Sequence, residues 1–215
     1  MSAQRILIHV PIVHTQADMG ALGKHIRRHL VESLGERWWQ GRLNTVDRFW
    51  DEIEASIAAL DLPYQGLRIY QDGLPVCGRE LDIVKELAAA GSRNHRLLLD
   101  LHRRGAAIMG TESGELLVEE YNRIRALLES PGSPSQGQDV KASGARLIEK
   151  RDRFIAARVD ATLAADETGI LFLGMLHSIA AFLPKDIRLL NLLPFDGNVP
   201  QMRQALHSAR RPGPG

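Results

Sequence analysis

Four side chains able to do acid–base or metal chemistry follow apolar runs of this sequence. His14 follows "RILIHVPIV", Asp72 follows "LRIYQ", Glu112 comes two residues after "AAIMG", and His177 closes a short turn after "GILFLG". A histidine oriented by a carboxylate can act as a general base or acid. Two imidazoles and two carboxylates also make a ligand set for zinc, manganese or iron. The residue types alone leave both chemistries open.

The apolar runs are the elements that must position these side chains. Their composition predicts strands at 5–13, 67–73, 106–110, 169–174 and 186–192. Helical periodicity predicts helices at about 15–35, 36–60, 78–91, 95–105, 114–130, 145–164 and 199–208. Alternating strands and helices predict an α/β fold with a mainly parallel central sheet of about five strands and helices on both faces. In such folds function gathers beyond the carboxyl ends of the strands, so we expect the four side chains to meet there.

The chain is of a size for one domain, and we expect a single α/β domain over residues 1–208. Residues 36–60 form a helical segment within it. The stretch 130–144, rich in Pro, Gly and Ser, predicts a mobile loop, and 209–215 predicts a disordered tail.

Charge and composition narrow the classes of partner. A formal net charge of +1 gives no reason to expect nucleic acid, and no apolar run is long enough for a membrane span. Cys77 is the one cysteine, so an intrachain disulfide is impossible. We expect a cytoplasmic protein that acts on a small-molecule or peptide substrate, and we leave assembly into a homo-oligomer open.

Several polar residues have a structural reading beside a functional one. Thr111 and Gln71 lie at predicted strand ends, where they can bind substrate or serve only the backbone. Arg151 can hold a substrate carboxylate or phosphate, or form structural ion pairs. His25 and His29 are spaced for a metal, but the cations around them favour a solvated basic face.

The sequence also resembles a known family. "GMLH" (174–177) after an apolar strand resembles the second G-x-x-H motif of the TraB/PrgY and Tiki proteins, and Arg151–Asp152 matches the pair on their preceding helix. "PIVH" (11–14) takes the place of their first motif. The wider superfamily, with the erythromycin esterases and ChaN-like haem-binding proteins, implies an α/β core with histidines and acids at strand ends. Pro11 replaces a glycine, and Gln71–Asp72 replaces a glutamate; these departures weaken the expectation of metal affinity and of Tiki-type proteolysis.

Two hypotheses follow. The first is a hydrolase of esters, amides or phosphoesters, with His14, His177, Asp72 and Glu112 as catalytic groups and Arg151, Thr111 and Gln71 as substrate-binding groups. A divalent metal (zinc, manganese or iron) would be held by His14, His177 and Asp72. The alternative is a non-catalytic module that binds or senses a small ligand and contacts a protein partner through its tryptophan-bearing helices.

Overall fold

The computed structural model describes residues 5–15, 18, 21–129, 137–192 and 197–209. Its strands are β1 (Arg5–Ile12), β2 (Leu67–Gln71), β3 (Ala107–Met109), β4 (Thr168–Gly174) and β5 (Ile187–Asn191). Its helices are α1 (Ala21–Leu34), α2 (Glu36–Ala59), α3 (Glu80–Ala89), α4 (Arg93–Arg103), α5 (Gly114–Glu129), α6 (Gly137–Thr162) and α7 (Val199–Ala209), with a short 3-10 helix, η2 (Ile179–Phe182).

Within these residues the strands form one parallel sheet in the order β3-β2-β4-β1-β5, which confirms the predicted α/β class. In the registers of the central strands, Ile12 lies opposite Gly174 and Gln71 lies opposite Phe172. The carboxyl ends of β1, β2 and β4 therefore meet at one edge of the sheet.

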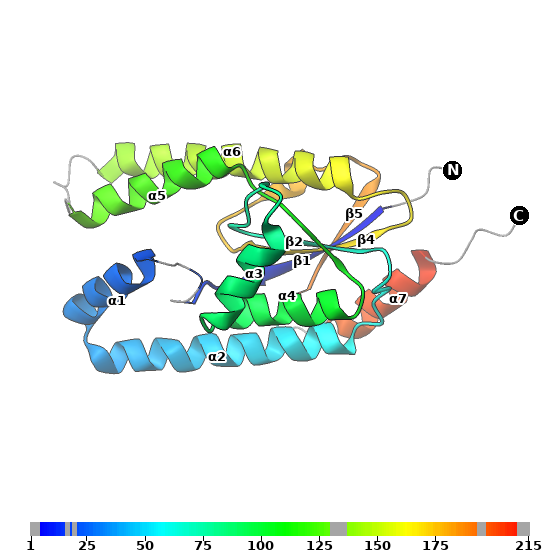
Figure 1. Ribbon diagram of the computed structural model, residues 1–215, viewed down its shortest axis with the longest axis horizontal. Helices are drawn as coiled ribbons and strands as arrows, with labels where there is room; N and C mark the ends of the chain where they lie inside the picture. The colour runs from blue at the N-terminus through cyan, green and yellow to red at the C-terminus, as the bar shows by residue number, and fades with distance from the viewer. Residues whose placement is uncertain (1–4, 16–17, 19–20, 130–136, 193–196, 210–215) are drawn as a thin grey trace, which may run out of the picture.

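Helices cover both faces of this sheet (Figure 1). Alternate residues along the strands face opposite sides, so each face has its own core. On one side Ile8 and Val10 pack in a cluster with Trp50 of α2 and Leu98 of α4. On the other side lies a cluster of strand residues and α6 residues: Leu7, Tyr70, Leu171, Leu173, Ile155 and Val159.

The central strand β4 explains the apolar run that precedes His177. All seven residues of β4 are buried, because β1 and β2 flank the strand and helices cover both its faces. A strand buried on both faces is a continuous apolar run rather than an alternating one. Each such Leu, Ile or Phe contributes about 1.5–3 kcal/mol by its burial, so β4 is a rigid support for the turn that carries His177.

Two sequence-based boundaries are wrong. Residues 137–144 were expected in a mobile loop, but they form the first turns of α6. A Cβ on Gly144 would lie 3.0 Å from Arg123 Nη1 of α5, so α5 and α6 are in close contact at this glycine. Tertiary contact of this kind can override the weak helix propensity of a segment that contains glycine. The rest of that stretch, 130–136, lies outside the described residues. The predicted tail began at 209, but α7 runs to Ala209, and 210–215 lie outside the described residues.

No helix in the described ranges is long and apolar enough to cross a membrane.

Candidate functional site

Asp72 is the central acceptor of the site. It directly follows β2, and its Oδ2 accepts hydrogen bonds from His14 Nε2 at 3.1 Å and from the Gly174 backbone N–H at 2.9 Å. Its Oδ1 accepts from Arg151 Nη2 at 2.7 Å. Burial alone would raise the pKa of Asp72, but the bond from His14 and the positive charges of His14, His177 and Arg151 lower it. The carboxylate therefore stays ionised and joins β1, β2, β4 and α6 at one point.

Gly174 is required at the end of β4 because of this carboxylate. A Cβ at this position would lie 2.8 Å from Asp72 Oδ2 and 3.5 Å from His14 Nε2. Only the absence of a side chain lets the backbone N–H reach Asp72. The glycine of "GMLH" therefore has a steric role in the site.

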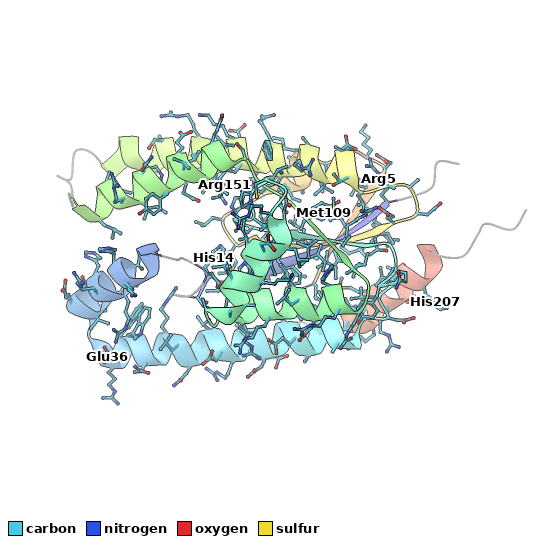
Figure 2. All side chains as sticks on the ribbon, in the orientation of Figure 1. Arg5, His14, Glu36, Met109, Arg151 and His207 are labelled. Atoms are coloured by element: carbon cyan, nitrogen blue, oxygen red, sulfur yellow. The ribbon has the colours of Figure 1, made fainter. Side chains whose placement is uncertain are left out.

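Arg151, a residue of α6 that Figure 2 labels, binds protein carboxylates. Its Nε and Nη2 donate to Glu112 at 2.7 and 2.5 Å, its Nη2 also donates to Asp72, and its Nη1 donates to Glu120 at 2.5 Å. The side chain is buried. A guanidinium engaged in this way supports the site from within, and its geometry does not present it to a substrate.

Glu112 holds the loop after β2 against the end of β3. Its Oε1 accepts from the Gly73 backbone N–H at 2.9 Å as well as from Arg151. Burial is the largest cause that raises the pKa of Glu112; the negative charge of Asp72 adds to it, and Arg151 opposes it. The carboxyl group is fully buried, so it acts on neighbouring residues rather than on bound molecules.

The two other predicted substrate contacts are also buried. The Thr111 hydroxyl donates to Met109 O and accepts from the Gln71 backbone N–H. The Gln71 side chain donates to Asp72 O at 3.0 Å, and within the described residues its Oε1 has no hydrogen-bond partner. These contacts serve the ends of β2 and β3.

His177 faces inward. Its Nδ1 lies 2.6 Å from Asp152 Oδ1, and Asp152 Oδ2 accepts from the Ser178 backbone N–H at 2.9 Å. Its Nε2 lies 3.8 Å from Asp72 Oδ2, and only 5% of the side chain is exposed. Burial opposes protonation, but the hydrogen bond that His177 donates to Asp152 and the charges of Asp72 and Asp152 outweigh it and raise the pKa of His177. The ring is thus a buried partner of two carboxylates.

His14 is the member of the group that reaches solvent. Its side chain, labelled in Figure 2, is 36% exposed. It lines a pocket of about 260 Å³ together with residues of α1 and α2. An ionised carboxylate only accepts, so His14 Nε2 donates to Asp72 and Nδ1 is left as the basic nitrogen. Burial opposes protonation, yet the hydrogen bond and charge of Asp72 raise the pKa of His14.

A second buried cluster, of Asp18, Ser92 and His95, lies next to Thr15. Asp18 Oδ2 accepts from the Thr15 N–H and hydroxyl at 2.6 and 2.7 Å, and Asp18 Oδ1 accepts from Ser92 Oγ. Ser92 caps α4 and lies 2.7 Å from His95 Nδ1. Although burial opposes it, bonds from His95, Ser92 and Thr15 lower the pKa of Asp18 to about 2. Thr15, next to His14, is therefore linked through Asp18 to the start of α4.

The group of His14, Asp72, His177 and Glu112, as it is arranged, does not fit a divalent metal. Among the residues that the structure describes, no group of three or more His, Cys, Asp and Glu side chains could hold a metal ion. Both oxygens of Asp72 already accept N–H groups, one of them from the Arg151 guanidinium, a cation that would repel a metal. His25 and His29 are exposed on α1.

The structure thus brings His14, Asp72 and His177 into direct proximity and connects Glu112 to them through Arg151. Sequence reasoning did not assign roles to Asp152 and Gly174, and it missed Glu120, Ser92 and His95. The signals for the first two lay in the Arg151–Asp152 pair and in the glycine of "GMLH". The signal for the α4 cap was a serine directly after Gly91, three residues before His95.

Comparison with known proteins adds no relative: no family model, curated protein or solved structure matches the chain. The TraB/PrgY–Tiki resemblance therefore rests on its short motifs.

Proposed function

We propose that the chain is a metal-independent hydrolase in which His14 is the general base and Asp72 orients it. One observation carries the proposal: a pocket-lining imidazole is hydrogen-bonded at 3.1 Å to a buried, ionised carboxylate that three other elements hold in place. A base of this kind, fixed by a rigid carboxylate, is the arrangement that general-base catalysis requires. Esters, amides and phosphoesters are the substrate classes open to it.

The proposed reaction uses water as the nucleophile. His14 Nδ1 takes a proton from a water molecule as the water oxygen forms a bond to the carbonyl carbon or phosphorus. Asp72 stabilises the imidazolium that results. When the bond to the leaving group breaks, the imidazolium returns its proton to the leaving oxygen or nitrogen. The products are an acid and an alcohol or amine, and His14 is neutral again.

The buried residues around Asp72 are positioning residues in this proposal. Arg151, Gly174 and His177 fix the carboxylate, and Glu112 and Asp152 fix Arg151 and His177 in turn. A base held by such a shell stays in its productive geometry without reorganisation.

The decisive test is His14→Asn against His25→Asn, a matched change of an exposed histidine on α1. Hydrolysis of p-nitrophenyl and amide substrates should fall at least about a hundredfold in His14→Asn, because general-base catalysis contributes that much. It should be unchanged in His25→Asn. The pH profile of the wild type should rise through a pKa above 6.5, since the pKa of His14 is raised and only the neutral ring is basic. Equal activity of the two variants would refute the assignment.

A ligand-binding or sensor module is the second candidate. Two observations favour this candidate. Asp72, Glu112 and Arg151 neutralise one another, and only His14 of the group reaches the pocket. Binding without turnover, unchanged by added zinc, manganese or iron, would support this candidate. Turnover that depends on one of these metals would replace the metal-independent mechanism.

A further inference from the structure

The pocket that His14 lines has an apolar wall. It lies between facing sides of α1 and α2 and the turn before α4. Its apolar lining consists of Ile26, Leu30, Trp39, Leu43 and Val46. All but Trp39, which is buried, are only partly covered by the protein, so they retain apolar surface for a bound molecule. At about 260 Å³ the pocket is below the usual range for drug-sized ligands and suits a small, narrow one.

The same pocket carries an excess of positive charge. Arg42, Arg93 and Arg96 line it together with one carboxylate, Asp47. Arg93 is neutralised, because it binds the carboxylates of α2 at 2.6 Å. Within the described part of the chain, the side chains of Arg42 and Arg96 form no hydrogen bond or ion pair, although the Arg96 backbone N–H donates to Ser92 O. Two guanidinium groups therefore face one carboxylate.

The position of Arg42 places this charge away from the base. Trp50 Nε1 donates to Val13 O at 3.3 Å, so Trp50 marks the level of His14 along α2. Arg42 precedes Trp50 by about two helical turns, roughly 12 Å along the axis. Leu43 and Val46 lie between them on the same side of the helix. A ligand that reaches from His14 to Arg42 must cross the apolar wall.

We propose that the substrate is a half-ester or half-amide of a short dicarboxylic acid. Its reacting carbonyl lies at His14, its methylene chain lies against the α1–α2 wall, and its free carboxylate is bound by Arg42. This inference rests on the proposed function for the reacting end only. The recognition of the free carboxylate is a property of the pocket and can be measured without turnover.

The binding test compares adipate with hexanoate by titration calorimetry on the whole chain. The two probes have the same number of carbons, and adipate carries the second carboxylate. Adipate should bind about ten- to a hundredfold more tightly, as expected for a charge-assisted hydrogen bond. Arg42→Gln should abolish this preference. Arg48→Gln, which removes the same charge from an exposed position of α2 outside the pocket lining, should keep it.

A turnover test separates this inference from the proposed function. Mono-p-nitrophenyl adipate should be hydrolysed with a kcat/KM at least about tenfold above that of p-nitrophenyl hexanoate, and Arg42→Gln should equalise the two. Equal, His14-dependent hydrolysis of both esters would overturn the substrate class and leave the hydrolase standing. An Arg42-dependent adipate preference without hydrolysis would keep the anion site and overturn the enzyme. Equal binding of adipate and hexanoate to the wild type overturns the inference outright.

Discussion

His14 and His177 approach the same oxygen of Asp72, yet their surroundings give them different roles. His14 is partly exposed and bonds Asp72 through Nε2, whereas both nitrogens of His177 lie near carboxylates. The pKa of each ring is raised, because neighbouring carboxylates outweigh burial. The two side chains are thus of the same type, and they differ in that only His14 reaches the pocket.

We predict that His177→Ala destabilises the protein by about 3 kcal/mol, because it leaves Asp152 and Asp72 buried with fewer partners. Urea unfolding measures the change. His25→Ala, on the exposed face of α1, should shift the free energy of unfolding by no more than about 0.5 kcal/mol. A His177→Ala variant as stable as His25→Ala would contradict the buried role.

The stabilisation from His177 should depend on pH. Its pKa is raised in the folded state, so its contribution is complete below the ordinary value of 6.5 and is lost as pH rises through the raised pKa. The difference in unfolding free energy between the wild type and His177→Gln should shrink between about pH 6 and about pH 9. His9 contributes with the opposite sign, because burial and the charge of His177 lower its pKa. A difference that grew with pH would show that the sign is wrong.

At the scale of the elements, the close approach of β2 and β4 forms the site. We predict that Gly174→Ala costs about 1–3 kcal/mol, since the added Cβ would lie 2.8 Å from Asp72 Oδ2. It should also reduce hydrolysis, because the carboxylate must move. Gly41→Ala is the control: nothing lies within 4 Å of a Cβ there, and alanine in a helix should stabilise by up to about 1 kcal/mol. Equal effects of both changes would argue against the steric role.

The Asp18 cluster joins the end of β1 to α4. The stability that the Asp18 carboxylate contributes should depend on pH in the acid range. The pKa of Asp18 is about 2 against an ordinary 3.8, so Asp18→Asn should cost about 2 kcal/mol near neutral pH. This contribution to stability is complete above pH 3.8 and is lost as the pH falls toward about 2. Denaturant unfolding at several pH values measures it, with exposed Asp47→Asn as the control. A cost that persisted at the lowest pH would rule out ionisation as its source.

The elements were largely predictable from sequence, whereas the division of roles within the site was not. Apolar runs mark β1, β2 and β4, and parallel pairing then brings Asp72 and His177 to one edge. The inward orientation of His177 depends on Asp152, which a separate helix supplies. The engagement of Arg151 by Glu112 depends likewise on the packing of α6 over β3. Such contacts between distant segments have no periodic signature along the chain.

At the scale of the whole molecule, two cores share one sheet. Ile53 of α2 and Ile155 of α6 are both fully buried, on opposite faces. Each core contains residues of the same strands, so loss of packing on one face also removes support from the strands that form the other core. The described part of the chain should therefore unfold as one cooperative unit.

We predict that Ile53→Ala and Ile155→Ala each cost about 2–5 kcal/mol and leave a single unfolding transition. Tryptophan fluorescence reports the face that contains Trp50, and far-UV circular dichroism reports all helices. The two signals should coincide in urea for the wild type and for both variants. Separate midpoints in Ile155→Ala would mean that the α6 face unfolds on its own.

The strand order also has a consequence for the chain as it is synthesised. Both neighbours of β1, β4 and β5, begin at or after Thr168, so the first strand leaves the ribosome long before anything exists for it to pair with. Until then β1 is an unpaired apolar segment and β2–β3 has an open edge, the states that invite aggregation and chaperone binding. Messages truncated before Thr168 should therefore give products that are degraded, and the His14–Asp72 pair can form only after β4 has been synthesised.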